Sequence, residues 1–122
     1  HQHDQILLST YLTVEEIEAL RDRRAEIIDG QTKAISQYID QLRARQSDLE
    51  AQTRRFKPYN PAPKALPLPS GLAADLVRTT STISQQQQAL AAKQRELQAL
   101  QQSFAEDIAR FRELKRSQPR GG

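Results

Sequence analysis

The second half of the chain places a large apolar residue at every seventh position, and no Pro or Gly interrupts this series. Its members are Leu76, Ile83, Leu90, Leu97, Phe104 and Phe111. A seven-residue repeat sustained over this length predicts a long α-helix with a narrow apolar stripe. Because a single helix cannot bury such a stripe, the repeat predicts a coiled coil and indicates no catalytic chemistry.

A second series with the same spacing occupies the first half of the chain. It runs through Val14, Arg21, Ile28, Ile35, Leu42, Leu49 and Phe56, and one member is polar. Thr13 and Glu16 have the spacing of a capping box, which satisfies backbone amides at a helix start. Pro58 disfavours helical geometry in the residue before it. We therefore expect a first long helix over residues 13–55.

The remaining residues divide into three further segments and a second helix. Residues 1–12 are expected to form an irregular, apolar lead-in that packs against this chain or a neighbouring one. Residues 56–70 contain five of the six prolines and predict an extended loop. A second long helix is expected over residues 71–117, followed by a tail at 118–122. With 122 residues, the chain is expected to form one domain.

The two apolar series pair in one antiparallel register. Facing residues in an antiparallel hairpin have numbers of constant sum, and this sum is 125 for Leu49 with Leu76 and for Ile28 with Leu97. The predicted fold class is therefore all-α: a long antiparallel two-helix coiled-coil hairpin with a Pro-rich tip.

The same register places mostly polar residues in every second layer. These pairs are Arg24 with Gln101, Gln31 with Gln94, Tyr38 with Gln87, and Arg45 with Thr80. Either such layers fix the register, or they are half exposed and the true seam is rotated. Leu20, Ile27 and Leu100 favour the rotation, because they form an apolar flank beside the predicted seam. The flank would receive residues 6–12 or a second hairpin. We expect a dimer in a four-helix arrangement, with a monomer as the alternative.

Basic residues cluster at the tip, although the net charge is only +3. Arg54, Arg55, Lys57 and Lys64 have no acidic residue between them. The simpler interpretation is that cations are favoured at the C-terminal end of a helix. The more specific interpretation is a binding surface for nucleic acid or another anion. Four charges form only a small basic patch, and the sequence has no motif that reads a nucleic-acid groove.

The tip also contains three apolar side chains, those of Tyr59, Leu66 and Leu68. We favour a stiff cap that folds these residues onto the helix ends, because leaving the leucines exposed is costly. The alternative is a Pro-rich recognition loop. The candidate partner-binding residues at the tip are Arg54, Arg55, Lys57, Tyr59, Lys64, Leu66 and Leu68.

The sequence provides no candidate for catalysis, for a cofactor or for a metal ion. Cysteine is absent, and His1 and His3 are the only histidines. The motifs of zinc proteases, phosphate-binding loops and EF-hands are also absent. No stretch approaches the ~20 apolar residues of a membrane-spanning helix. We therefore expect a protein that is not an enzyme and has no transmembrane segment.

Five segments of the chain form a recurrent bacterial pattern: residues 4–17 (DQILLSTYLTVEEI), 21–24 (RDRR), 56–59 (FKPY), 66–69 (LPLP) and 107–112 (DIARFR). Together they resemble the C-terminal coiled-coil region of small exported bacterial proteins that carry a short N-terminal β-rich domain of unknown function. The resemblance implies a periplasmic or envelope location and a β domain that is absent from these 122 residues. The tip departs from the commoner form, because residues 61–63 (PAP) replace an acidic, Asn-containing segment.

These observations predict a non-enzymatic structural or protein-interaction module of the bacterial envelope. The hairpin would present its tip or its flank to a protein partner, which is either another protein or a second copy of the chain. Two alternatives remain. One is a nucleic-acid or anionic-surface binder acting through the basic tip, with nucleic acid the less expected ligand. The other is a periplasmic adaptor or chaperone-like hairpin. The sequence does not identify the partner.

Overall fold

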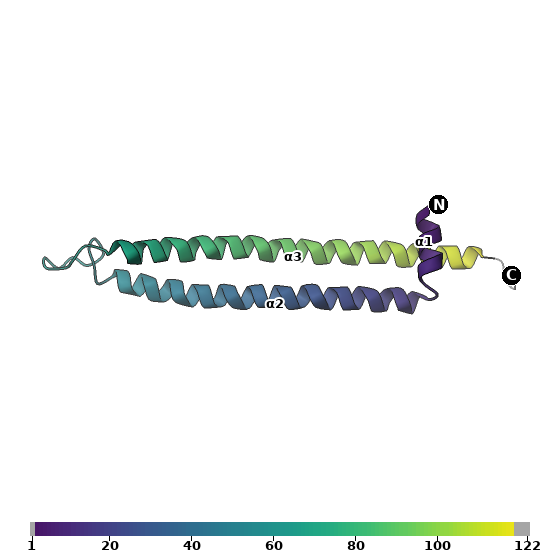
Figure 1. Cartoon of the computed structure of the whole chain (residues 1–122), viewed down its shortest axis with the longest axis horizontal. Coiled ribbons are helices and arrows are strands. Elements are labelled where there is room, and N and C mark those ends of the chain that lie inside the picture. Colours follow the sequence, from purple (N-terminus) through teal and green to yellow (C-terminus); the bar gives the residue numbers. More distant parts are fainter. Residues whose placement is uncertain (1, 119–122) are drawn as a thin grey trace. The chain divides into compact units, whose positions relative to one another are not determined.

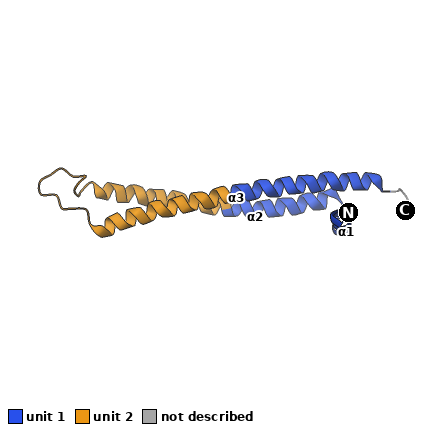
Figure 2. Cartoon of the chain, turned by 90° about the horizontal axis from the view of Figure 1, so that it is seen from above, with its two compact units in different colours: residues 1–31, 93–122 blue, residues 32–92 orange. Residues whose placement is uncertain are grey.

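The computed structural model describes residues 2–118, and these form three α-helices and no strand. The helices are α1 (Gln2–Thr10), α2 (Val14–Thr53) and α3 (Ser70–Ser117), drawn in Figure 1. They pack against each other through apolar side chains, which confirms an all-α fold. The chain divides into two compact units, coloured in Figure 2. Unit 1 contains residues 1–31 and 93–122, and unit 2 contains residues 32–92.

Local signals at the helix ends lie close to where the sequence places them. The backbone amide of Glu16 donates to the Thr13 hydroxyl at 3.3 Å. The Glu16 carboxylate accepts from the amide of Leu12 at 2.7 Å, one residue earlier than in a standard capping box. α2 ends at Thr53 and not at residue 55. The amides of the next three residues each donate to the carbonyl three residues before, which tightens the chain after the last turn.

The expectation of an irregular lead-in is wrong, because residues 2–10 form the helix α1. A helix of 9 residues is shorter than the roughly 12–15 residues that an isolated helix needs in water. Contacts with the rest of unit 1 must therefore stabilise it. Leu7 is 2% exposed and belongs to the core of that unit.

The core of unit 1 contains residues from all three helices. Its buried members are Leu7, Ile17, Phe104, Ile108 and Phe111. Half-buried residues pack around them: Leu8, Tyr11, Val14, Leu20, Leu100 and Leu114. The Arg24 guanidinium lies 5.6 Å from the centroid of the Phe104 ring and covers one side of this core.

Unit 2 has a thinner core that includes polar side chains. Its buried residues are Ile39, Leu42, Leu49, Thr53, Thr79 and Ile83. The Gln46 amide donates to the Thr80 hydroxyl at 3.0 Å, so α2 and α3 also meet through a hydrogen bond here. Arg45 and Asp75 form an ion pair at 3.8 Å on the same pair of helices.

The two apolar series face inward, but the polar layers between them do not lie where the first interpretation placed them. No member of either series is fully exposed. The residues expected in the polar layers are all exposed: Arg24, Gln31, Tyr38, Arg45, Thr80, Gln87, Gln94 and Gln101. Their neighbours one position later on α2 and one earlier on α3 are buried or half-buried: Ala25, Thr32, Ile39, Gln46, Thr79, Gln86, Lys93 and Leu100.

The seam is therefore rotated. On α3 it turns toward Leu100, as the flank indicated, but on α2 it turns away from Ile27, which is 62% exposed. Each heptad contributes two core positions to the stripe. The apolar series identifies the first, and the second lies either three or four residues after it. In α2 it follows after four residues, which buries Ile39 and leaves Tyr38 outside. In α3 it follows after three, which turns Leu100 inward in place of Gln101.

The rotation predicts opposite effects for two neighbouring substitutions on α2. Ile39 is 5% exposed and Tyr38 is 43% exposed. Ile39→Ala should lower the free energy of unfolding by about 2–5 kcal/mol, because it leaves a cavity in the seam. Tyr38→Ala should change it by less than about 1 kcal/mol. Urea unfolding followed by circular dichroism measures both values. A larger loss for Tyr38→Ala would contradict the rotated seam.

Candidate functional site

Residues 54–69, here called the tip loop, connect α2 to α3 within unit 2. Two backbone hydrogen bonds join the arms of this loop. The amide of Lys57 donates to the carbonyl of Leu66 at 2.8 Å, and the amide of Leu68 donates to the carbonyl of Lys57 at 3.1 Å. Lys57 therefore holds the returning segment beside the departing one.

Asn60 and the Lys57 side chain make further hydrogen bonds within the loop. The Asn60 side chain donates to the carbonyl of Arg55 at 3.3 Å and accepts from the amide of Ala62 at 2.9 Å. The Lys57 ammonium donates to the carbonyl of Pro63 at 3.2 Å. Each proline in the loop also fixes its own φ angle. The tip loop is therefore ordered by its own contacts.

The large apolar side chains of the tip loop do not all fold onto the helix ends. Leu68 is half-buried, whereas Tyr59 is 59% exposed and Leu66 is 68% exposed. The favoured expectation of a cap is thus wrong for two of its three residues. Most backbone amides of the loop donate to groups within the loop or the last turn of α2, so folding the loop back is not needed to satisfy these amides.

The four basic residues of the tip loop are all exposed. They are Arg54, Arg55, Lys57 and Lys64, and none takes part in an ion pair with another described residue. The next acid along the chain, Asp75, already faces two arginines, Arg45 at 3.8 Å and Arg78 at 3.5 Å. The structure thus gathers the seven predicted tip residues into one loop that has positive charge and exposed apolar groups.

The predicted flank does not form one surface. Leu20 and Leu100 are half-buried and pack against the core of unit 1. Part of the flank is therefore covered within the chain itself. Ile27 is 62% exposed. It borders a groove of about 210 Å³ between α2 and α3 within unit 1.

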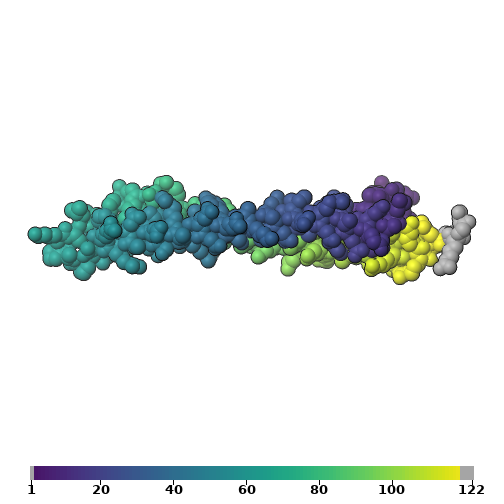
Figure 3. All heavy atoms as spheres, turned by 90° about the horizontal axis from the view of Figure 1, so that it is seen from below, coloured from purple at the N-terminus to yellow at the C-terminus, as the bar shows by residue number. Residues whose placement is uncertain are grey.

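Polar side-chain contacts attach α1 to α3, and the sequence analysis does not predict them. Arg110 donates two hydrogen bonds to the Asp4 carboxylate, at 2.9 and 2.7 Å, and one to Glu113 at 2.9 Å. His3 Nε2 lies 2.9 Å from Asp107 Oδ1. Figure 3 shows the purple N-terminal residues against the yellow end of α3. A long-range pair of this kind has no signal in a sequence where α1 is not recognised as a helix.

The contact with Arg110 makes the docking of α1 dependent on pH. Hydrogen bonding to Arg110 holds the pKa of Asp4 below its ordinary value of 3.8. Because the docked pKa is the lower one, ionised Asp4 stabilises docking above the ordinary pKa. This contribution is lost as pH falls through the lowered value.

We expect the backbone amide signals of residues 2–10 to move toward those of undocked α1 as the pH falls below 3.8, the ordinary pKa of Asp4, and through the lowered value of the docked state. Asp4→Asn should weaken docking at neutral pH and remove this part of the pH dependence. Asp29→Asn removes another exposed acid and is the control. An NMR titration measures the effect, and an unchanged profile in Asp4→Asn would contradict it.

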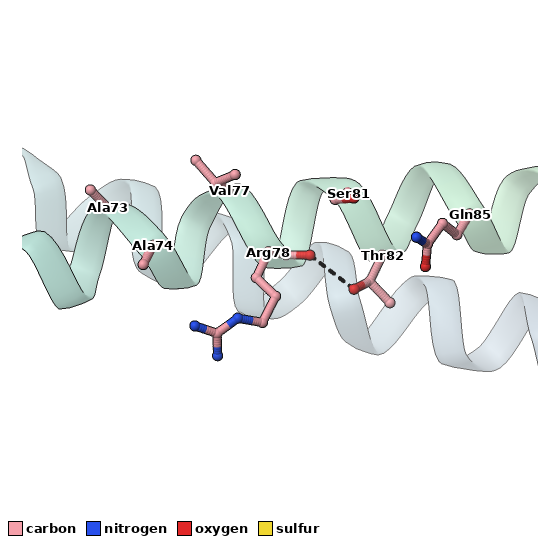
Figure 4. Close-up of a pocket in the computed structure, with 7 residues that line it drawn as sticks. All are labelled: Ala73, Ala74, Val77, Arg78, Ser81, Thr82 and Gln85. Carbon is pink, nitrogen blue, oxygen red and sulfur yellow. Dashed lines mark hydrogen bonds between the residues drawn. The ribbon is translucent and has the colours of Figure 1, made fainter.

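A second surface lies on α3 in unit 2, where small residues form a groove of about 720 Å³ (Figure 4). Its lining residues are Ala73, Ala74, Val77, Arg78, Ser81, Thr82 and Gln85. Val77 is 70% exposed. Sequence reasoning followed the apolar stripe and missed this face, because only Val77 on it is large and apolar.

The described residues contain no group of three or more His, Cys, Asp or Glu side chains that could hold a metal ion. None of their helices combines the length and the hydropathy of a membrane-crossing segment. No protein-family model, curated protein or solved structure matches the chain.

Proposed function

We propose that this chain is a non-enzymatic protein-interaction module, in which an antiparallel helical hairpin presents the tip loop to a partner protein. The observation that carries this proposal is the tip loop itself. Internal hydrogen bonds order it, yet Tyr59 and Leu66 remain exposed. Exposed large apolar groups on an ordered loop are a feature of interaction surfaces.

Contacts within each unit support the antiparallel hairpin. In unit 1 Arg24 lies over Phe104, and in unit 2 Gln46 bonds to Thr80. Both pairs have residue numbers whose sum lies within three of 125. The rotated layers keep the same register, because Ala25 with Leu100 and Ile39 with Gln86 also sum to 125.

The proposal predicts that removing the exposed apolar groups abolishes partner capture without unfolding the chain. The test is a pull-down from bacterial envelope extract with the double variant Tyr59→Ala/Leu66→Ser. Capture of a specific protein should fall by at least about tenfold, as when central interface residues are truncated. Helix content by circular dichroism should be unchanged.

The matched control is Leu12→Ser/Tyr38→Ala, which removes an exposed aliphatic residue and an exposed tyrosine outside the tip loop. Capture by this variant should equal that of the wild type. Equal losses in the two variants, or full capture by the tip variant, would contradict tip recognition.

A second candidate function is the binding of nucleic acid or an anionic surface. The observation in its favour is the absence of acidic residues between Glu50 and Asp75, a stretch that holds four cations. Such binding would weaken steeply with salt.

We also propose that the chain forms a dimer through its remaining exposed apolar residues. The most exposed large apolar residues of α2 and α3 are Ile27, which is 62% exposed, and Val77, which is 70% exposed. Light scattering of the wild type should give a mass twice that of one chain. The variant Ile27→Glu should have the mass of a single chain. A single-chain mass for the wild type at every concentration would rule the dimer out.

An envelope location is part of the proposal and rests on the motif resemblance. Cell fractionation that recovers the protein with the cytoplasm would contradict it.

A further inference from the structure

The tip loop combines exposed cations with exposed apolar side chains in a stretch without acids, since no acidic residue lies between Glu50 and Asp75. On α2 and α3, some basic side chains have an acidic partner, as Arg45 has in Asp75 and Lys93 has in Glu96. In the tip loop, Arg54, Arg55 and Lys64 have none among the described residues, and two large apolar side chains lie exposed in the same loop.

We propose that the tip loop recognises an acidic protein segment that also carries apolar side chains. This inference rests on the proposed function and names the chemistry of its partner. Carboxylates of the partner would face Arg54, Arg55 and Lys64, and its apolar groups would cover Tyr59 and Leu66. Complementary charge gives such a contact its selectivity and speeds encounter.

The order of the loop favours this kind of recognition. Asn60 binds the carbonyl of Arg55, and Lys57 binds the backbone of both Leu66 and Leu68. These bonds connect the basic first residues of the tip loop to its apolar returning segment. A surface that is already ordered loses less conformational entropy when a partner binds.

Lys57 differs from the other three cations. Its ammonium donates to the carbonyl of Pro63, so this side chain holds the loop together. The geometry therefore assigns Lys57 a positioning role and leaves the other three as contact residues.

Nucleic acid and lipid are less suited to the same surface. Single-stranded nucleic acid is bound through several stacking aromatic rings, and Tyr59 is the one exposed aromatic ring in the tip loop. Anionic membranes are recognised by clusters of roughly four to eight basic residues. The tip loop has four, and one of them is bonded to a carbonyl.

The test selects random phage-displayed peptides on the full chain. The triple variant Arg54→Gln/Arg55→Gln/Lys64→Gln serves for counter-selection. Recovered peptides should be rich in Asp and Glu and should contain large apolar residues. Fluorescence anisotropy should show binding at least about tenfold weaker to the triple variant and to Leu66→Ser. Raising NaCl from about 50 to about 300 mM should weaken binding further.

The matched control is Lys33→Gln/Arg43→Gln/Arg95→Gln, which removes the same amount of charge from exposed positions on α2 and α3. It should bind the selected peptides within about twofold of the wild type, since charges more than a Debye length away are screened.

Three outcomes would overturn the inference. Tip-dependent peptides that are neutral or basic would exclude an acidic partner while leaving the proposed function intact. Recovery of tip-independent peptides alone would exclude the tip loop as the binding surface and count against both proposals. Tighter binding of a DNA duplex or of phosphatidylserine vesicles, lost in the triple variant, would reassign the cations to nucleic acid or to lipid.

Discussion

The apolar stripe along α3 has to be buried against another helix, and the remaining features of the fold depend on this requirement. A stripe of this kind is narrow, so it gives each layer of the seam few apolar contacts. In unit 2 the shortage is evident, because two of its six buried residues, Thr53 and Thr79, are polar. The hydrogen bond from Gln46 to Thr80 at the edge of this seam adds a polar contact between the helices. Polar layers stabilise less than apolar ones but restrict the register.

Unit 1 meets the same requirement differently, by adding a third helix. Phe104 and Phe111 are larger than the residues at corresponding positions in unit 2, and Leu7 from α1 joins them in the core. Because α1 is too short to be stable alone, its folding is coupled to its docking. The pair between Asp4 and Arg110 sets the position of α1 along α3. The apolar contacts of Leu7 supply the burial that a surface ion pair does not.

The sequence predicts features that depend on residue spacing and local chemistry. It does not predict features that depend on contacts between residues far apart in the chain. The apolar series, the cap at Thr13 and the Pro-rich loop are all readable because each depends on neighbours within one or two turns. The rotation of the seam cannot be predicted from the sequence, because a seven-residue repeat is equally compatible with a second core position three or four residues after the first. Burial of Ile39 rather than Tyr38 settles it. α1 is missed because its stability comes from docking on residues far along the chain, through Leu7 in the core and the pair with Arg110.

The candidate site shows the same division. Its membership is predicted from composition, because prolines and basic residues gather there. The exposure of its side chains is not predicted from composition, because it depends on whether the backbone groups of the loop form hydrogen bonds within the loop. Lys57 and Asn60 make such hydrogen bonds within the loop. The side chains of Tyr59 and Leu66 take no part in these bonds and remain exposed. Side chains that are not needed for stability can change without cost to the fold, so the recognition properties of the tip loop are separable from the stability of the helices that carry it.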